Sequence, residues 1–139
     1  MKQKRLYIDF LIDIYQQTLL IKQFLIGSTF LDFQEDFKLF YAICRTLEII
    51  GEATKNIPKE IFVKFPEVKW KEMAKLRDLI IHHYQGLQEE IIWNICKKDI
   101  NPLRKQVKSI INETLKSIDN AELLKLLKLK IKVIEDKFK

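Results

Sequence analysis

Residues that break regular structure are scarce in this chain, since its 139 residues include only 3 glycines and 3 prolines. Few tight turns are therefore available, and long segments must connect them. Leu, Ile, Lys, Glu and Gln dominate these segments, whereas the Asn-Gly and Asp-Gly pairs that mark hairpins are absent. With 47% hydrophobic residues, the chain can bury one core. We therefore expect an all-α domain.

Apolar residues repeat at helical spacing and predict where the helices lie. A first helix is expected over about 5–26, before Gly27. A cap at Ser28 or Thr29 opens a second helix, which continues to about Asn56. The face that this helix is expected to bury is made up of Phe33, Phe37, Phe40, Cys44 and Leu47.

The second half of the chain shows the same periodicity. After a short helical turn at 58–65, a third long helix ends before Gly86 and a fourth starts near Leu87. Pro102, with Asn101 as a cap, is expected to interrupt or restart the fourth helix. The third helix is expected to bury Trp70, Met73, Leu76 and Ile80. The core candidates that follow are Ile91, Ile92, Ile95, Cys96, Leu103, Val107, Ile110 or Ile111, and Leu115.

The third helix ends in the octet Arg-Asp-Leu-Ile-Ile-His-His-Tyr, residues 77–84, where the sequence looks equipped for chemistry. Arg77 carries a permanent cation with a planar fork of donors that suits a phosphate. His82, five residues later, can give or take a proton near neutral pH. Together these side chains predict phosphodiester chemistry on RNA.

Helical geometry limits how this octet can act. At about 100° per residue, His82 is turned by roughly 140° from Arg77, so one straight helix cannot bring both to one phosphate. Either the last turn deforms, or a second copy of the chain completes the site. Asp78 shares a face with His82, four residues on, where its carboxylate could orient the imidazole or hold its charged form.

Positive charge is concentrated at the C-terminal end. Residues 97–139 contain 12 Lys or Arg against 6 Asp or Glu, whereas residues 1–96 contain 13 of each, so the net charge of +6 comes from the last third. This polarity favours a polyanion or an acidic partner, although a solvated lysine-rich helix face is the plainer reading. Cys44 and Cys96 lack metal-site spacing, and polar residues interrupt the N-terminal apolar stretch. We expect a cytoplasmic protein with no metal, no cofactor and no membrane span.

Three blocks of sequence follow one another in the middle of the chain: LEIIGEA at 47–53, PEVKWKEMAKL at 66–76 and RDLIIHHY at 77–84. In this order and spacing they resemble the HepT-like family of the HEPN superfamily, over about residues 5–115. The resemblance implies an antiparallel HEPN-type bundle of four main helices, here with an extra C-terminal helix. It also implies a homodimer in which the arginine and histidine motifs of both chains face one cleft.

The resemblance implies a function as well. Members of the family are metal-independent endoribonucleases, toxins of type VII-like HEPN/MNT pairs, with an MNT-type nucleotidyltransferase as antitoxin. Arg77 would bind the phosphate, and His82 would activate the ribose 2′-hydroxyl or protonate the leaving oxygen. Tyr84 would receive AMP from the antitoxin, which would repel RNA, and Asp78 stands where asparagine is more usual. The alternative is a non-catalytic nucleotide-binding scaffold or modification target of the nucleotidyltransferase.

These residues also have plainer readings. Arg77 could pair with Asp78 or Glu52 on the surface, and Glu52 could line the cleft or be solvated. His82 could serve the helix dipole, and Tyr84 could be an interface aromatic.

The C-terminal segment extends past the region of resemblance. We divide the chain into a HEPN/HepT-like domain at 1–118 and a basic amphipathic helix at 119–139, opened by Asp119 or Asn120. Its apolar face is formed by Leu123, Leu127, Ile131, Ile134 and Phe138. We expect this face to pack on the bundle or on a partner chain, with RNA backbone contact as the next reading and membrane-surface binding last.

Overall fold

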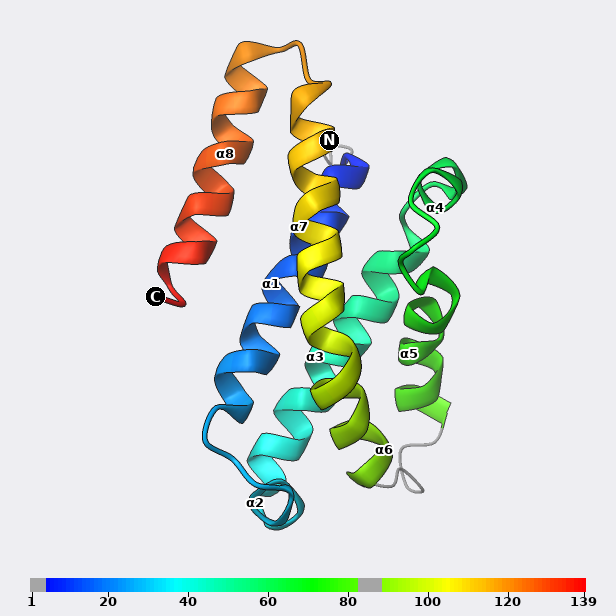
Figure 1. Cartoon of the computed structure of the whole chain (residues 1–139), viewed down its shortest axis with the longest axis vertical. Helices are drawn as coiled ribbons and strands as arrows, with labels where there is room; N and C mark the ends of the chain where they lie inside the picture. The colour runs from blue at the N-terminus through cyan, green and yellow to red at the C-terminus, as the bar shows by residue number, and fades with distance from the viewer. Residues whose placement is uncertain (1–4, 83–88) are drawn as a thin grey trace.

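The computed structural model describes residues 5–82 and 89–139, and all regular structure in these ranges is helical. Figure 1 shows a bundle of long helices with one helix lying along its side. The bundle consists of α1 (Tyr7–Leu25), α3 (Phe37–Lys55), α5 (Trp70–His82) and α7 (Ile100–Lys116), and the added helix is α8 (Ala121–Asp136). The connecting elements are α2 (Phe30–Glu35), α4 (Lys59–Lys64), α6 (Glu89–Asn94) and the π-helical segment η1 (Ile95–Asp99). The predicted all-α bundle with an extra C-terminal helix is confirmed.

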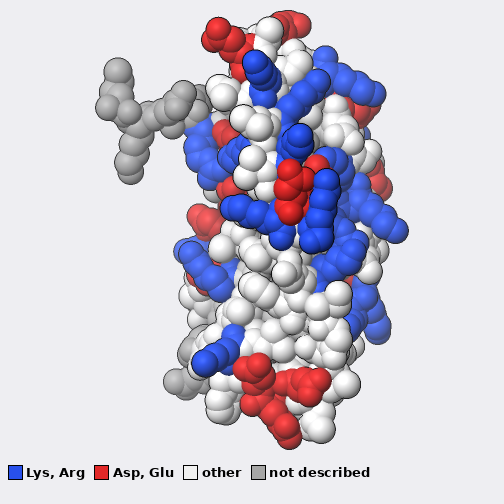
Figure 2. Space-filling view, turned by 90° about the vertical axis from the view of Figure 1, so that its left-hand side faces the viewer, with Lys and Arg blue, Asp and Glu red and all other residues white. Residues whose placement is uncertain are grey.

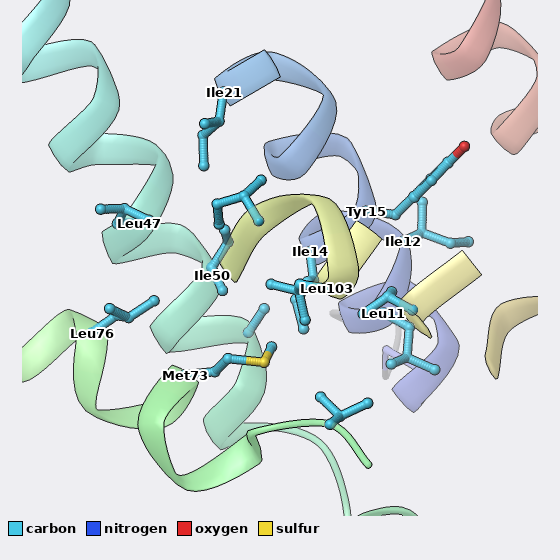
Figure 3. Packing of buried hydrophobic residues seen from close by; sticks show 14 of the residues in the cluster. Leu11, Ile12, Ile14, Tyr15, Ile21, Leu47, Ile50, Met73, Leu76 and Leu103 are labelled. Carbon is cyan, nitrogen blue, oxygen red and sulfur yellow. The ribbon is translucent and has the colours of Figure 1, made fainter. Parts of the chain in front are cut away.

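The hydrophobic core lies between the four long helices. α3 packs against α1 on one side and α5 on the other, and α1 also packs against α7. Figure 3 shows where these helices meet, through Leu11 and Ile14 of α1, Ile50 of α3, Met73 of α5 and Leu103 of α7, all of which are buried. Burying an aliphatic side chain of this size contributes about 1.5–3 kcal/mol, so the predicted apolar stripes hold the bundle together.

The helix predicted to continue to about Asn56 is in fact two helices, α2 and α3. Thr29 caps α2 as predicted, since its hydroxyl accepts a hydrogen bond from the Asp32 N–H at 3.1 Å. Asp36 ends α2 and caps α3, because its backbone is extended and its carboxylate accepts a hydrogen bond from the Leu39 N–H at 3.2 Å. The predicted burial of Phe37 is wrong, since this first residue of α3 is 75% exposed.

The α-helix stops at Asn94 and restarts at Ile100 after η1, close to the restart predicted at Pro102. The predicted cap at Asn101 is wrong, because Asn101 already lies inside α7. A proline inside a helix lacks an N–H group and crowds the carbonyl four residues earlier. That carbonyl belongs to Lys98, which lies in the wider π-helical turn η1. The predicted burial of Ile91 on α6 is also wrong, since this residue is 46% exposed, whereas its neighbour Ile92 is buried as predicted.

α8 folds back along α1 and α7 (Figure 1). Asn120 caps it, accepting a hydrogen bond from the Leu123 N–H at 3.0 Å. The Tyr15 hydroxyl of α1 donates a hydrogen bond to the Glu135 carboxylate at 2.6 Å, and Lys108 of α7 lies 3.1 Å from the same carboxylate. Three apolar residues of α8 are buried against the bundle: Leu127, Ile131 and Ile134. The division of the chain at 118 stays a prediction.

The Tyr15–Glu135 contact is a charged one at neutral pH. Burial, followed by the hydrogen bond to Glu135, raises the pKa of Tyr15 well above its usual value. Burial also acts to raise the pKa of Glu135, but the hydrogen bonds from Tyr15 and Lys108 outweigh it and lower the pKa overall. The carboxylate therefore stays ionised and the phenol stays protonated, as a donor–acceptor pair requires.

Within 5–82 and 89–139, no helix has both the length and the apolar character needed to cross a bilayer.

α3 and α5 approach each other closely at Gly51. A Cβ atom at this position would clash with the backbone nitrogen of Arg77 and would lie 2.9 Å from the Arg77 Cβ. Backbone atoms cannot move aside as a flexible side chain can, so any larger residue must push the two helices apart. The missing side chain of Gly51 thus sets the position of Arg77 against α3.

The substitution Gly51→Ala tests this contact. Alanine is normally favoured over glycine inside a helix by about 1 kcal/mol. Here we expect the free energy of unfolding to fall by about 1–3 kcal/mol, because the added methyl group overpacks the α3–α5 contact. Chemical denaturation of the wild type, Gly51→Ala and Gly51→Leu measures this, with a larger loss expected for leucine. An alanine variant as stable as the wild type, or more stable, would show that the helices are not in forced contact.

Candidate active site

Arg77 lines a charged cavity of about 310 Å³ formed by α3, α5 and the N-terminal part of α1. The guanidinium is reachable from solvent, since the Arg77 side chain is 41% exposed. The other charged side chains that line the cavity are Arg5, Asp13, Arg45, Glu48 and Glu52. A solvent-accessible arginine in such a hollow can meet an anionic ligand.

Every arginine of this cavity is paired with a carboxylate. Arg77 contributes its Nε, which lies 2.8 Å from Oε2 of Glu52. Arg45 lies 3.3 Å from Glu48, and Arg5 lies 2.9 Å from Asp13. A guanidinium has five N–H donors, so a partner at Nε leaves the two terminal NH₂ groups of Arg77 for a phosphate. The pair with Glu52 therefore orients the cation without using its whole fork.

Glu52 is the residue whose role the sequence left open between lining the cleft and being solvated. The structure shows both, since Glu52 lines the cavity and its side chain is 56% exposed. Glu52 also forms the surface pair with Arg77 that the plainer reading of the sequence predicted. Part of the signal is visible in the sequence, because Glu52 is a charge within an otherwise apolar run and directly follows Gly51. What the sequence cannot show is that α5 lies opposite this point of α3.

Asp78 makes an ion pair that the sequence did not predict. Its carboxylate lies 2.9 Å from Nζ of Lys55, at the C-terminal end of α3. This ion pair offsets part of the negative charge that Asp78 places next to Arg77. The predicted support of His82 by Asp78 stays a prediction.

Two of the predicted site residues cannot be placed by their side chains. His82 is the last residue of α5, five residues after Arg77, and its side chain lies outside what the structure describes. Tyr84 lies in the segment 83–88, which is also outside the described residues. The relation of the imidazole and the phenol to Arg77 therefore stays a prediction.

Neither cysteine is suited to act as a nucleophile. Cys44 and Cys96 are free and buried, and burial raises the pKa of Cys44 to about 11 and that of Cys96 to about 12. Both thiols are then protonated at neutral pH, whereas the thiolate is the reactive form. In the part of the chain that is described, no group of three or more His, Cys, Asp or Glu could hold a metal ion. The features that remain for chemistry are the partly exposed guanidinium of Arg77 and the histidine that ends the same helix, His82.

Comparison with known proteins shows which family this chain resembles. A family model described as "Ribonuclease HepT-like" matches residues 14–110, which include Gly51, Glu52, Arg77 and His82. A protein of Thermococcus cleftensis named "Probable ribonuclease HepT" is 44% identical over 101 residues, covering 73% of this chain and 92% of that protein.

Two other relatives carry names that begin "Putative RNase". One, from Methanocaldococcus jannaschii, is 43% identical over 113 residues, covering 81% of this chain and 90% of the relative. The other, from Caldanaerobacter subterraneus, is also 43% identical over 113 residues and is covered over 98% of its length. No solved structure matches the chain. From the family match and these relatives, the chain belongs to the ribonuclease HepT-like family.

Proposed function

We propose that this protein is a metal-independent endoribonuclease and the toxin of a type VII-like HEPN/MNT toxin–antitoxin pair. The observation that supports this best is the placement of Arg77, which Glu52 orients in a charged, open cavity five residues before His82. The family match and the names of the relatives support RNA as the substrate.

The proposed chemistry divides the work between two side chains. The terminal NH₂ groups of Arg77 bind the non-bridging oxygens of the scissile phosphate and stabilise the charge that develops on them. His82 accepts the proton of the ribose 2′-hydroxyl as its oxygen attacks phosphorus, or donates a proton to the departing 5′-oxygen. The products are a 2′,3′-cyclic phosphate and a 5′-hydroxyl. Because the RNA supplies its own nucleophile, the step needs no metal-bound water.

A homodimer would supply the second half of the site. On a helix, His82 is turned by roughly 140° from Arg77, so an imidazole from a second chain meets the phosphate more easily. The exposed Ile81 lies one turn after Arg77 on α5, within about 40° of it, and could join such a contact. Two further exposed aromatic residues, Phe37 and Tyr41, lie three to four turns before Glu52 on α3, so they could extend the interface along that helix but do not border Arg77.

Asp78 is proposed to support His82, one turn later on α5. A carboxylate beside the phosphate site would weaken anion binding, but the ion pair with Lys55 reduces that cost.

An MNT-type nucleotidyltransferase is the proposed antitoxin, and both proteins would act in the cytoplasm, where their RNA targets are. Transfer of AMP to Tyr84 would add a bulky negative charge two residues after His82, and that charge would repel the RNA backbone. The second candidate function is a non-catalytic scaffold, in which the same charged cavity binds a nucleotide and Tyr84 is a modification target. The solvent-accessible cation of Arg77 is compatible with this alternative as well.

Cleavage of RNA in EDTA separates the two functions. We expect the purified wild type to cut tRNA or mRNA and to leave 2′,3′-cyclic phosphate ends. Arg77→Ala and His82→Ala are expected to lower the rate by about 100-fold or more, as is usual when one acid–base or charge-stabilising group is removed. His83→Ala is the matched control and should keep the wild-type rate. A wild type as inactive as both variants would favour the scaffold.

Mass spectrometry of the coexpressed protein tests the proposed modification by the antitoxin. We expect coexpression with an MNT-type nucleotidyltransferase, taken from a neighbouring gene of this kind, to add AMP to the wild type, with loss of RNA cleavage. Tyr84→Phe should gain no AMP and should keep its activity in the presence of the transferase. Intact-mass and peptide mass spectrometry measure both. AMP found on a residue other than Tyr84, or on none, would contradict this part of the proposal.

A further inference from the structure

α8 has a second apolar face, which points away from the bundle. Leu126, Leu129 and Val133 are 64%, 56% and 48% exposed. At 100° per residue these three side chains fall within about 60° of one another, and they are turned by about 130° from the face that packs on α1 and α7. Exposed leucines are common one at a time, but here three are aligned over about two turns.

Lysines flank this strip on both sides in a heptad pattern. With Leu126 and Val133 at positions a and Leu129 at position d, the flanking g positions are Lys125 and Lys132, and the e positions are Lys130 and Lys137. All of these lysines are exposed, although Lys130 also lies 3.7 Å from Asp9 of α1. Figure 2, which faces this side of the molecule, shows Lys and Arg side chains gathered around uncharged surface. An acidic residue lies at each end of the strip: Glu122 before it and Asp136 after it.

The lysines disfavour a second copy of α8 as the occupant. In either orientation of two such helices, the e and g positions of one face those of the other, so ammonium groups would meet ammonium groups. A helix with Glu or Asp at its e and g positions would instead form attractive pairs on both sides of the strip. The lysines thus disfavour a second α8 and favour an acidic helix as the partner.

Two other anionic partners fit less well. A helix that binds in a membrane surface usually has a broad apolar face with aromatic residues, whereas this strip is one side chain wide and purely aliphatic. Single-stranded RNA is held by stacking on aromatic rings or arginine, and 121–136 contains neither. The strip is therefore too narrow to bury much apolar area in a membrane surface, and RNA gains nothing from three aligned aliphatic side chains.

We propose that the outer face of α8 docks an acidic amphipathic helix of a partner protein. The family match ends at residue 110, within α7, so this surface lies outside the part of the chain that carries the ribonuclease resemblance. The inference does not rest on RNA cleavage. Because a strip of two to three turns buries less area than a standard interface, the docking strip alone should bind in about the micromolar range.

Fluorescence anisotropy with two synthetic peptides tests the proposal on the full-length protein. One peptide has about three heptads with Leu at a and d and Glu at e and g, and the other has Lys in place of each Glu. We expect the glutamate peptide to bind at least tenfold more tightly than the lysine peptide. The triple variant Lys125→Glu/Lys132→Glu/Lys137→Glu should reverse this preference.

A leucine variant separates docking from general attraction to a protein of net charge +6. Leu126→Gln/Leu129→Gln should weaken binding of the glutamate peptide at least tenfold, since it removes the apolar strip while leaving every charge unchanged. Leu31→Gln on α2 is the matched control, because Leu31 is 59% exposed and lies far along the chain from α8. Its binding should equal that of the wild type, and thermal unfolding should show that all variants are folded.

The proposal is overturned if the glutamate peptide does not bind, or binds no better than the lysine peptide. Binding that survives the double leucine variant would also overturn it. Vesicles with phosphatidylserine and a single-stranded RNA are tested in parallel. If either is retained by the wild type and lost in the α8 variants, while the glutamate peptide is not bound, α8 serves that ligand and the proposed helix partner is wrong.

Discussion

Arg77 owes its position to the contact between α3 and α5 at Gly51. A side chain at Gly51 would collide with the backbone of Arg77, so the two helices can approach this closely only with glycine there. The next residue, Glu52, then lies within 2.8 Å of Arg77 and fixes one donor of its guanidinium. A backbone contact in the core and an ion pair at the surface are thus made by adjacent residues. The proposed phosphate site depends on both.

The apolar periodicity of the sequence predicts the bundle well, because each long helix buries one continuous stripe. It is harder to predict whether a polar residue will continue a helix or end it and cap the next one. Asp36 does the latter, since its carboxylate caps α3, and Phe37 is left exposed. The opposite happens at Pro102, where the π-helical turn η1 accommodates a residue that normally ends a helix. Arg77 is predicted as a site residue from its spacing to His82. The pairing of Glu52 with Arg77 depends on how α3 and α5 pack, so the sequence alone gives it only as one alternative.

The family match covers most of the bundle but not the C-terminal helix α8. Residues 14–110 match the ribonuclease HepT-like family and contain the charged cavity with Arg77 and Glu52. α8 lies beyond this match and is attached by the hydrogen bond from Tyr15 to Glu135 and by three buried aliphatic residues. Its inner face thus belongs to the fold, while its outer face carries much of the excess positive charge. The proposed RNA site and the proposed partner surface thus lie on different parts of one small chain.

A mixture of two inactive variants tests whether two chains share one site. Arg77→Ala chains keep His82, and His82→Ala chains keep Arg77, so a mixed dimer of the two retains one complete pair across the interface. Unfolding and refolding the two variants together, followed by the RNA cleavage assay, should recover a substantial fraction of wild-type activity, although each variant alone is inactive. If the mixture stays as inactive as its components while mass spectrometry shows that mixed dimers have formed, the arginine and histidine of one site come from the same chain, and the shared site proposed here is wrong.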